Sequence, residues 1–105
     1  MDVYERRREM QKQWRENAKQ CEWIGDITIE EVMKHRTPKD CWVIIDGIVY
    51  NWTQYVYNHP GGSSHFLGKN PDITVPFHNF HRGMDISFVE KLKIGRLVSS
   101  KYLYS

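Results

Sequence analysis

The chain has 105 residues and a formal net charge of +2, which suits a single domain and lacks the basic excess of a nucleic-acid-binding protein. Hydrophobic residues make up 40% of the chain, with four Trp, six Tyr and four Phe, which excludes disorder throughout. No apolar run approaches the ~20 residues of a membrane span, and the charged N-terminus contains no signal peptide. We therefore expect a cytoplasmic, monomeric protein without a membrane anchor, in which Cys21 and Cys41 are reduced thiols.

Residues 1–22 are predicted to form a charged helical extension. Residues 3–22 contain no Gly or Pro and many helix formers, but their apolar stripe, which includes Met10 and Trp14, is narrow. We expect an extension that packs Trp14 onto the domain or frays at its end. A helix that docks a partner protein is the alternative.

A compact domain is expected over residues 23–98, with a polar tail over residues 99–105. Its first half combines β-branched runs with cap and turn residues. The elements predicted there are a strand at Ile27, a helix from the capping box Thr28/Glu31 to about Lys34, a strand at Cys41–Ile45, a turn at Asp46–Gly47 and a strand at Ile48–Asn51.

The second half of this domain is predicted to be mainly helical. The expected elements are a helix capped by Thr53 that stops before His59, a short helix from Gly61 to Leu67, a loop at Gly68–Asp72, a helix with Pro76 in its first turn, a helix capped by Asp85 and a last strand at Ile94–Leu97. This order of short strands and short helices predicts a small α+β domain with a short mixed sheet.

Histidine is concentrated between residues 59 and 81, which hold four of the five histidines. In the motif His59-Pro60-Gly61-Gly62, the proline favours an extended backbone at His59, and the glycines allow a bulky flat group to approach closely. His81 lies at the end of another aromatic helix. Two imidazoles that follow two different helices would face each other across a slot. A slot of this kind suits haem, because haem iron takes axial ligands from both sides of the ring. The hydrophobic residues expected to line this slot are Phe66, Leu67, Phe77 and Phe80.

The stretch Ile27–Leu97 resembles the haem-binding domain of the cytochrome b5 family. The matching segments appear in the family's order and cover about seventy residues. They are Ile27–Val32, Lys34-His35, Asp40–Ile45, Gly47, Val49-Tyr50, Thr53, His59–Gly62, Asp72, Thr74 and Ile94–Leu97. The form Phe80-His81-Arg82 is most similar to the cytochrome b5 domain of soluble flavohaem reductases, which carry a separate flavin domain.

The resemblance implies a haem b cofactor with His59 and His81 as axial ligands. It also implies that the carbonyl of Gly62 holds the second ring nitrogen of His59 and that Tyr55 replaces the family's usual pocket Phe. Pro60 and Gly61 then also contact the haem. With both axial positions filled, the expected function is one-electron transfer, from a flavoprotein NAD(P)H-dependent reductase to an acceptor protein. The chain would then be an electron carrier and no enzyme itself, or the haem component of a larger oxidoreductase system.

The chain departs from the family pattern around the second ligand. The spacing between the two ligands is slightly short, and a serine that often contacts a haem propionate is missing. The acidic rim with which many members dock basic partners is also absent. Between His59 and Arg82, Asp72 is the only carboxylate, against the cations Lys69 and Arg82. We therefore expect a slightly positive charge around the slot.

Several alternatives stay open at this point. His78, three residues before His81, is a rival second ligand, whereas His65 is expected at the surface or the pocket edge and His35 at a helix C-terminus. A domain of the membrane-associated progesterone-receptor-like type binds haem or other ligands without paired histidines. A structural zinc domain would use His59, His65, His78 and His81, although their spacing is unlike that of common zinc sites.

Overall fold

The computed structural model of the chain describes residues 2–58, 67–80, 82–83 and 87–99. Its centre is one five-stranded sheet with the strand order β1-β5-β4-β3-β2, in which β1 and β5 are parallel and all other neighbours are antiparallel. This confirms the predicted mixed sheet. The strands are β1 Gly25–Thr28, β2 Arg36–Thr37, β3 Asp40–Ile45, β4 Ile48–Asn51 and β5 Lys93–Val98.

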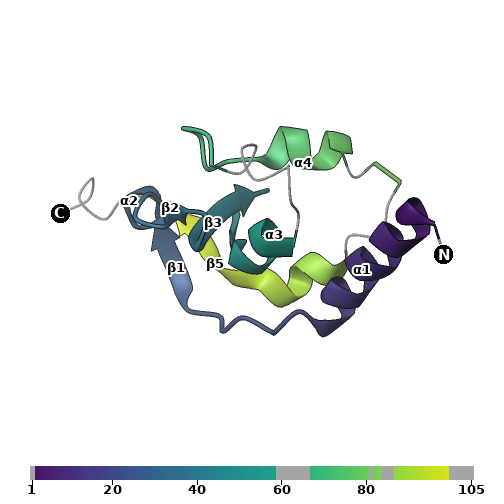
Figure 1. Cartoon of the computed structure of the whole chain (residues 1–105). Coiled ribbons are helices and arrows are strands. Elements are labelled where there is room, and N and C mark those ends of the chain that lie inside the picture. The colour runs from purple at the N-terminus through teal and green to yellow at the C-terminus, as the bar shows by residue number, and fades with distance from the viewer. Residues whose placement is uncertain (1, 59–66, 81, 84–86, 100–105) are drawn as a thin grey trace.

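Short helices surround this sheet, which confirms the α+β class. Figure 1 shows the N-terminal helix at one end of the molecule and α2 at the other, with α3 and α4 between them. The described helices are α1 Val3–Asn17, α2 Ile29–Val32, α3 Thr53–Asn58, α4 Thr74–Phe80 and the 3₁₀-helix η2 Ser87–Leu92.

Strand β3 is buried on both faces because its residues are hydrophobic at every position from Cys41 to Ile45. Since successive side chains alternate between faces, β3 contributes to two core clusters. The larger cluster contains Cys41, Val43, Ile45, Tyr50, Trp52, Tyr55, Val56, Ile73, Phe77, Phe88, Val89 and Leu92. The smaller cluster contains Ile27, Val32, Trp42, Ile44, Val49 and Ile94. Helices α3 and α4 therefore pack on one face of the sheet, and α2 packs on the other.

The turn between β3 and β4 has the predicted form. Asp46 has a φ of 52° and Gly47 a φ of 78°, so both residues adopt the left-handed backbone that a two-residue hairpin requires. The strands pair from Ile45 with Ile48 to Trp42 with Asn51. This turn lies next to α4, because the amide of Asp46 donates a hydrogen bond of 2.9 Å to the hydroxyl of Thr74.

The N-terminal extension packs onto the domain, as expected for Trp14. Its half-buried side chain lies against the larger core cluster. The helix itself is shorter than predicted and ends at Asn17, because the following residues are extended and hydrogen-bond to the domain. Cys41 is a fully buried free thiol, and burial raises its pKa, which confirms its place in the core.

Two further expectations about elements need correction. Thr28 caps α2 by accepting a hydrogen bond from the amide of Glu31, but α2 ends at Val32 and a turn follows, so it does not extend to Lys34. Strand β2 was not expected, because its two residues have no local strand pattern and pair only with the start of β3. Asp85, predicted to cap the last helix, lies outside the described residues.

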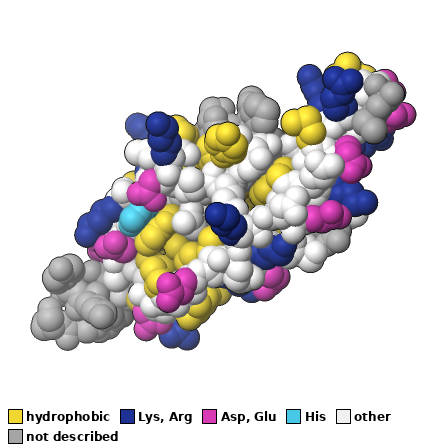
Figure 2. Space-filling view, turned by 60° about the horizontal axis from the view of Figure 1, so that its bottom comes forward, with side chains coloured by type: hydrophobic (Ala, Val, Ile, Leu, Met, Phe, Trp, Pro, Cys, Tyr) yellow, Lys and Arg dark blue, Asp and Glu magenta, His cyan; other side chains and the backbone are white. Residues whose placement is uncertain are grey.

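Within the described residues, no helix combines the length and the hydrophobicity needed to cross a membrane. Figure 2 shows that Lys and Arg side chains are interspersed with Asp and Glu side chains on the face that it presents. This face therefore has no large region of a single charge sign, in agreement with the small net charge.

Gly95 provides a test of the parallel contact between β1 and β5. Gly95 pairs with Gly25, and a Cβ atom on Gly95 would meet the carbonyl oxygen of Gly25 and approach Cγ1 of Ile27 to 2.8 Å. We expect Gly95→Ala to lower the free energy of unfolding by about 2 kcal/mol, because a packed backbone cannot yield to the added methyl group.

The control is Gly68→Ala, since a Cβ atom there meets no atom of the described residues within 4 Å. We expect a change within about 0.5 kcal/mol for this variant. Urea unfolding followed by far-UV circular dichroism measures both. Equal midpoints for the two variants would show that β1 and β5 do not meet at Gly95.

Candidate functional site

Helix α3 leads directly to the motif His59-Pro60-Gly61-Gly62. The side chain of Asn51 caps this helix, accepting hydrogen bonds from the amide (3.2 Å) and the hydroxyl (2.7 Å) of Thr53. Thr53 was predicted to be the cap, but it is the first residue of α3, and its hydroxyl accepts a bond of 3.0 Å from the amide of Cys41. The start of α3 is thus fixed to β3 and β4, and its last residue, Asn58, immediately precedes His59.

Helix α4 is held against the edge of the same sheet. The Ile44 amide donates to the carbonyl of Pro71 and the Ile73 amide donates to the carbonyl of Ile44, both at 2.9 Å. The Asp72 carboxylate accepts hydrogen bonds from the amide (3.0 Å) and the hydroxyl (2.6 Å) of Thr74, so it caps α4. Helix α4 ends at Phe80, immediately before His81.

Trp52 joins the two helices. Its side chain is fully buried, and its ring lies 4.6 Å from the ring of Tyr55 in a stacked geometry and 5.9 Å from the ring of Phe77 in an edge-on geometry. The sequence analysis did not single out Trp52. The available signal was its place as the apolar residue between the end of β4 and the first residue of α3.

The structure brings three of the predicted pocket residues together. Tyr55 and Phe77 are buried in the larger core cluster, and the half-buried Leu67 packs against it. Burial also raises the pKa of Tyr55, so its hydroxyl stays neutral at physiological pH. Phe80, by contrast, is 69% exposed at the end of α4. The remaining predicted site residues, His59, Pro60, Gly61, Gly62, Phe66 and His81, lie outside the described residues, as does His65.

His78, the rival second ligand, contacts the turn between β3 and β4. Its Nε2 atom lies 2.7 Å from a carboxylate oxygen of Asp46, and both side chains are about half exposed. Asp46 therefore places a carboxylate next to α4. The charge count over residues 59–82 did not include it. Together with the exposed Lys69, Asp72 and Arg82, it gives two carboxylates and two cations. The charge next to α4 is therefore balanced over these four residues, while the slightly positive charge expected around the slot as a whole stays a prediction.

Arg36 connects the sheet to the segment that follows the motif. Its guanidinium donates hydrogen bonds to the carbonyls of Trp42 (2.6 Å) and Gly68 (3.0 Å). His35, expected at a helix C-terminus, follows α2 and stacks on Trp42 with ring centroids 3.6 Å apart, while its Nδ1 atom contacts the Asp40 carboxylate. His35 therefore belongs to the opposite face of the sheet and not to the slot.

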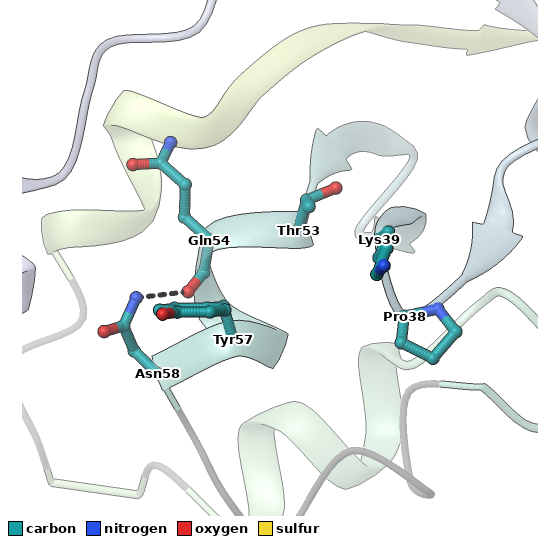
Figure 3. Close-up of a pocket in the computed structure, with 6 residues that line it drawn as sticks. All are labelled: Pro38, Lys39, Thr53, Gln54, Tyr57 and Asn58. Carbon is teal, nitrogen blue, oxygen red and sulfur yellow. Dashed lines mark hydrogen bonds between the residues drawn. The ribbon is translucent and has the colours of Figure 1, made fainter.

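An open hollow of about 440 Å³ lies on the outer side of α3. Figure 3 shows Tyr57 and Asn58 on one side of it and Pro38 and Lys39 on the other. Of the described residues predicted for the haem pocket, none lines this hollow, because α3 turns Tyr55 and Val56 toward the core. Among the described residues, no group of three or more His, Cys, Asp or Glu side chains is placed to hold a bare metal ion.

Comparison with known proteins places this arrangement in a family. The model of the family described as "Cytochrome b5-like Heme/Steroid binding domain" matches residues 28–98. Cytochrome b558 of Ectothiorhodospira vacuolata, described as a prokaryotic homologue of cytochrome b5, has a structure with a TM-score of 0.54 and 33% identity, over 69% of this chain and 96% of that chain.

Curated relatives match about seventy percent of this chain. An acyl-lipid (8-3)-desaturase of Physcomitrium patens is 41% identical over 73% of this chain, an NADH nitrate reductase of Cucurbita maxima 36% over 71%, and cytochrome b5 reductase 4 of Xenopus tropicalis 38% over 69%. The matched regions span 16%, 8% and 14% of these relatives' own lengths. The chain therefore belongs to the cytochrome b5-like haem-binding domain family, a family of electron carriers whose cofactor is haem b.

Proposed function

We propose that this chain is a b-type cytochrome in which His59 and His81 hold the haem iron from both sides. The observation that supports this proposal is the placement of α3 and α4. Both helices pack on Trp52 on one face of the sheet, and each ends at the residue immediately before one of these histidines. Two imidazoles that follow two helices on one face suit the two axial positions of a haem.

The described surroundings fit a porphyrin. Tyr55, Leu67 and Phe77 provide aromatic and aliphatic surface, and the described residues include no buried charged side chain that would oppose an apolar macrocycle. When bound, the haem supplies an iron that takes up and releases one electron. The residues of the chain exclude water from the ring and, through Trp52, keep the two helices at a fixed separation.

His78 is the weaker candidate for the second ligand. Its Nε2 atom already contacts Asp46 at 2.7 Å, so ligation by His78 would give up this ion pair. His81 has the further support of the family motif. We therefore assign the second axial position to His81 in this proposal.

The electron donor in this proposal is a flavoprotein NAD(P)H-dependent reductase. The names of two relatives, NADH nitrate reductase and cytochrome b5 reductase 4, support a reductase as the donor. With both axial positions filled, the iron offers no open site for a substrate, so the chain passes single electrons to an acceptor protein and carries out no bond chemistry itself.

The visible spectrum tests the ligation. We expect the reduced wild-type protein to show the split bands of low-spin haem, and His59→Ala and His81→Ala each to lose them, because each removes one of two iron bonds. His78→Ala is the control and should keep the wild-type spectrum. Loss of the low-spin spectrum in His78→Ala, with retention in His81→Ala, would assign the second ligand to His78. A five-coordinate spectrum of the wild-type protein would contradict paired ligation altogether.

Haem is also expected to stabilise the fold. A ligand that binds only the native state raises stability by about 2.7 kcal/mol at a free concentration of 100 times its dissociation constant. For a domain of this size we expect the melting temperature to rise by about 10 °C or more. Thermal melts of the haem-free and haem-loaded protein measure this. The double variant with His59→Ala and His81→Ala is the control, and an equal rise in that variant would contradict stabilisation through iron ligation.

The balanced charge near α4 predicts weak electrostatic steering. Asp46 and Asp72 offset Lys69 and Arg82, so electron transfer to a basic acceptor such as cytochrome c should depend little on ionic strength. We expect Lys69→Glu to accelerate this reaction severalfold at low salt.

The control for this prediction is Lys34→Glu, which makes the same change of total charge beyond α2, on the other face of the sheet. Stopped-flow rates at two salt concentrations compare the three proteins. A wild-type rate that falls steeply with salt, or equal acceleration in both variants, would show that α4 does not border the docking surface.

A further inference from the structure

The N-terminal helix α1 lies outside the region that matches the family, yet it contacts the helix that leads to His59. The Trp14 ring is edge-on to the rings of Tyr55, at 5.5 Å, and Phe88, at 5.6 Å. Tyr55 and Phe88 are themselves stacked at 5.8 Å. Trp14 thus covers the outer side of an aromatic pair that includes a predicted haem-pocket residue.

Gln11 extends this contact to the end of α3. Its side-chain amide donates a hydrogen bond of 3.0 Å to the carbonyl of Asn58, and its side-chain oxygen accepts one of 3.0 Å from the indole of Trp14. The last carbonyls of a helix have no partner within the helix, so this bond satisfies a group that α3 itself leaves open. The carbonyl of Asn58 also belongs to the peptide unit that enters His59. Because that unit is planar, a bond to its oxygen restrains the orientation of the His59 amide.

The connection from α1 to the sheet is fixed at several points. The side chain of Gln54 of α3 forms two hydrogen bonds with the backbone of Lys19: its oxygen accepts one from the Lys19 amide (2.8 Å), and its amide group donates one to the Lys19 carbonyl (3.1 Å). The amide of Cys21 donates to the carbonyl of Lys91 at 2.7 Å, and the side chain of Lys91 donates to the carbonyl of Glu16 at 2.9 Å. These bonds restrain α1 from moving away from α3 as a unit.

We propose that α1, through Gln11 and Trp14, is a positioning element that holds the Asn58–His59 peptide and so sets how firmly the chain retains haem. This inference rests on the proposed ligation by His59. Gln11 acts through the backbone and touches neither iron nor porphyrin in this proposal, so it is a positioning residue. The family's own segments do not supply the contact, because it comes from residues that precede the matched region.

The test compares two isosteric changes on the same helix. Gln11→Glu keeps the size of the side chain but removes the amide that donates to the carbonyl of Asn58. Gln13→Glu adds the same charge at an exposed position whose side chain contacts only Glu9, among the hydrogen bonds of the described residues. The two variants thus separate the bond to Asn58 from the effect of an added carboxylate. Trp14→Ala, which removes the aromatic contact, is the third variant.

The first readout is the rate of haem transfer to excess apomyoglobin. We expect Gln11→Glu to lose haem about fivefold faster than the wild-type protein, the factor that corresponds to one net hydrogen bond of about 1 kcal/mol. Trp14→Ala should lose haem at least tenfold faster, since it removes a large aromatic contact. Gln13→Glu should retain the wild-type rate.

The second readout is the electron paramagnetic resonance spectrum of the ferric protein, because its g-values depend on how the two imidazole planes are oriented. We expect shifted g-values in Gln11→Glu and unchanged values in Gln13→Glu. A merely structural role of α1 would lower the stability of the haem-free protein without moving the g-values. Wild-type haem loss and wild-type g-values in Gln11→Glu would overturn the inference.

The spectrum of the wild-type protein distinguishes failure of the proposed ligation from failure of the inference about α1. If the wild-type protein binds low-spin haem and His59→Ala abolishes the low-spin spectrum, the proposed ligation stands. The Gln11 variants then test the positioning role of α1 alone. A wild-type protein without low-spin haem overturns the ligation and this inference together.

Discussion

The burial of Trp52 is the constraint on which the arrangement of the site depends. Its amide donates a hydrogen bond of 2.6 Å to the carbonyl of Cys41, which fixes the residue to β3, and its ring contacts Tyr55 of α3 and Phe77 of α4. A buried aromatic ring of this size contributes a large share of the hydrophobic stabilisation at such a junction. Together with the hydrogen bonds that tie α4 to β3, this side chain sets how α3 and α4 lie relative to each other.

The sheet could be predicted from the sequence because its signals are local. The hydrophobic run Cys41–Ile45, the residues Asp46-Gly47 and the returning strand specify a hairpin without reference to the rest of the fold. The cap of α2 at Thr28 is a local signal of the same kind. The parallel pairing of β1 with β5 joins segments about seventy residues apart, and no local pattern predicted it.

The contacts that position the site are not local, and for that reason the sequence did not predict them. Asp46 contacts His78 across 32 positions of the chain, and Arg36 reaches the carbonyl of Gly68 across the same separation. Nothing in the sequence around Asp46 or Arg36 predicts which distant residue each of them contacts. The same reasoning explains the start of α3: Thr53 fits the local preference for a cap, but its hydroxyl bonds to β3, and the side chain of Asn51 accepts the hydrogen bond from the amide of Thr53.

An electron carrier gains from ligands that keep their geometry in both oxidation states, because any movement of the iron ligands adds to the barrier for electron transfer. Side chains that hold a cofactor are kept in place by neighbours that are themselves packed and hydrogen-bonded. The motif at His59 contains two glycines, which restrain the backbone weakly. On the N-terminal side of His59, Asn58 closes α3 and offers a further point of restraint. The bond from Gln11 to the carbonyl of Asn58 lies at this position, so in this proposal the extension that precedes the family's domain restrains the peptide that leads to His59.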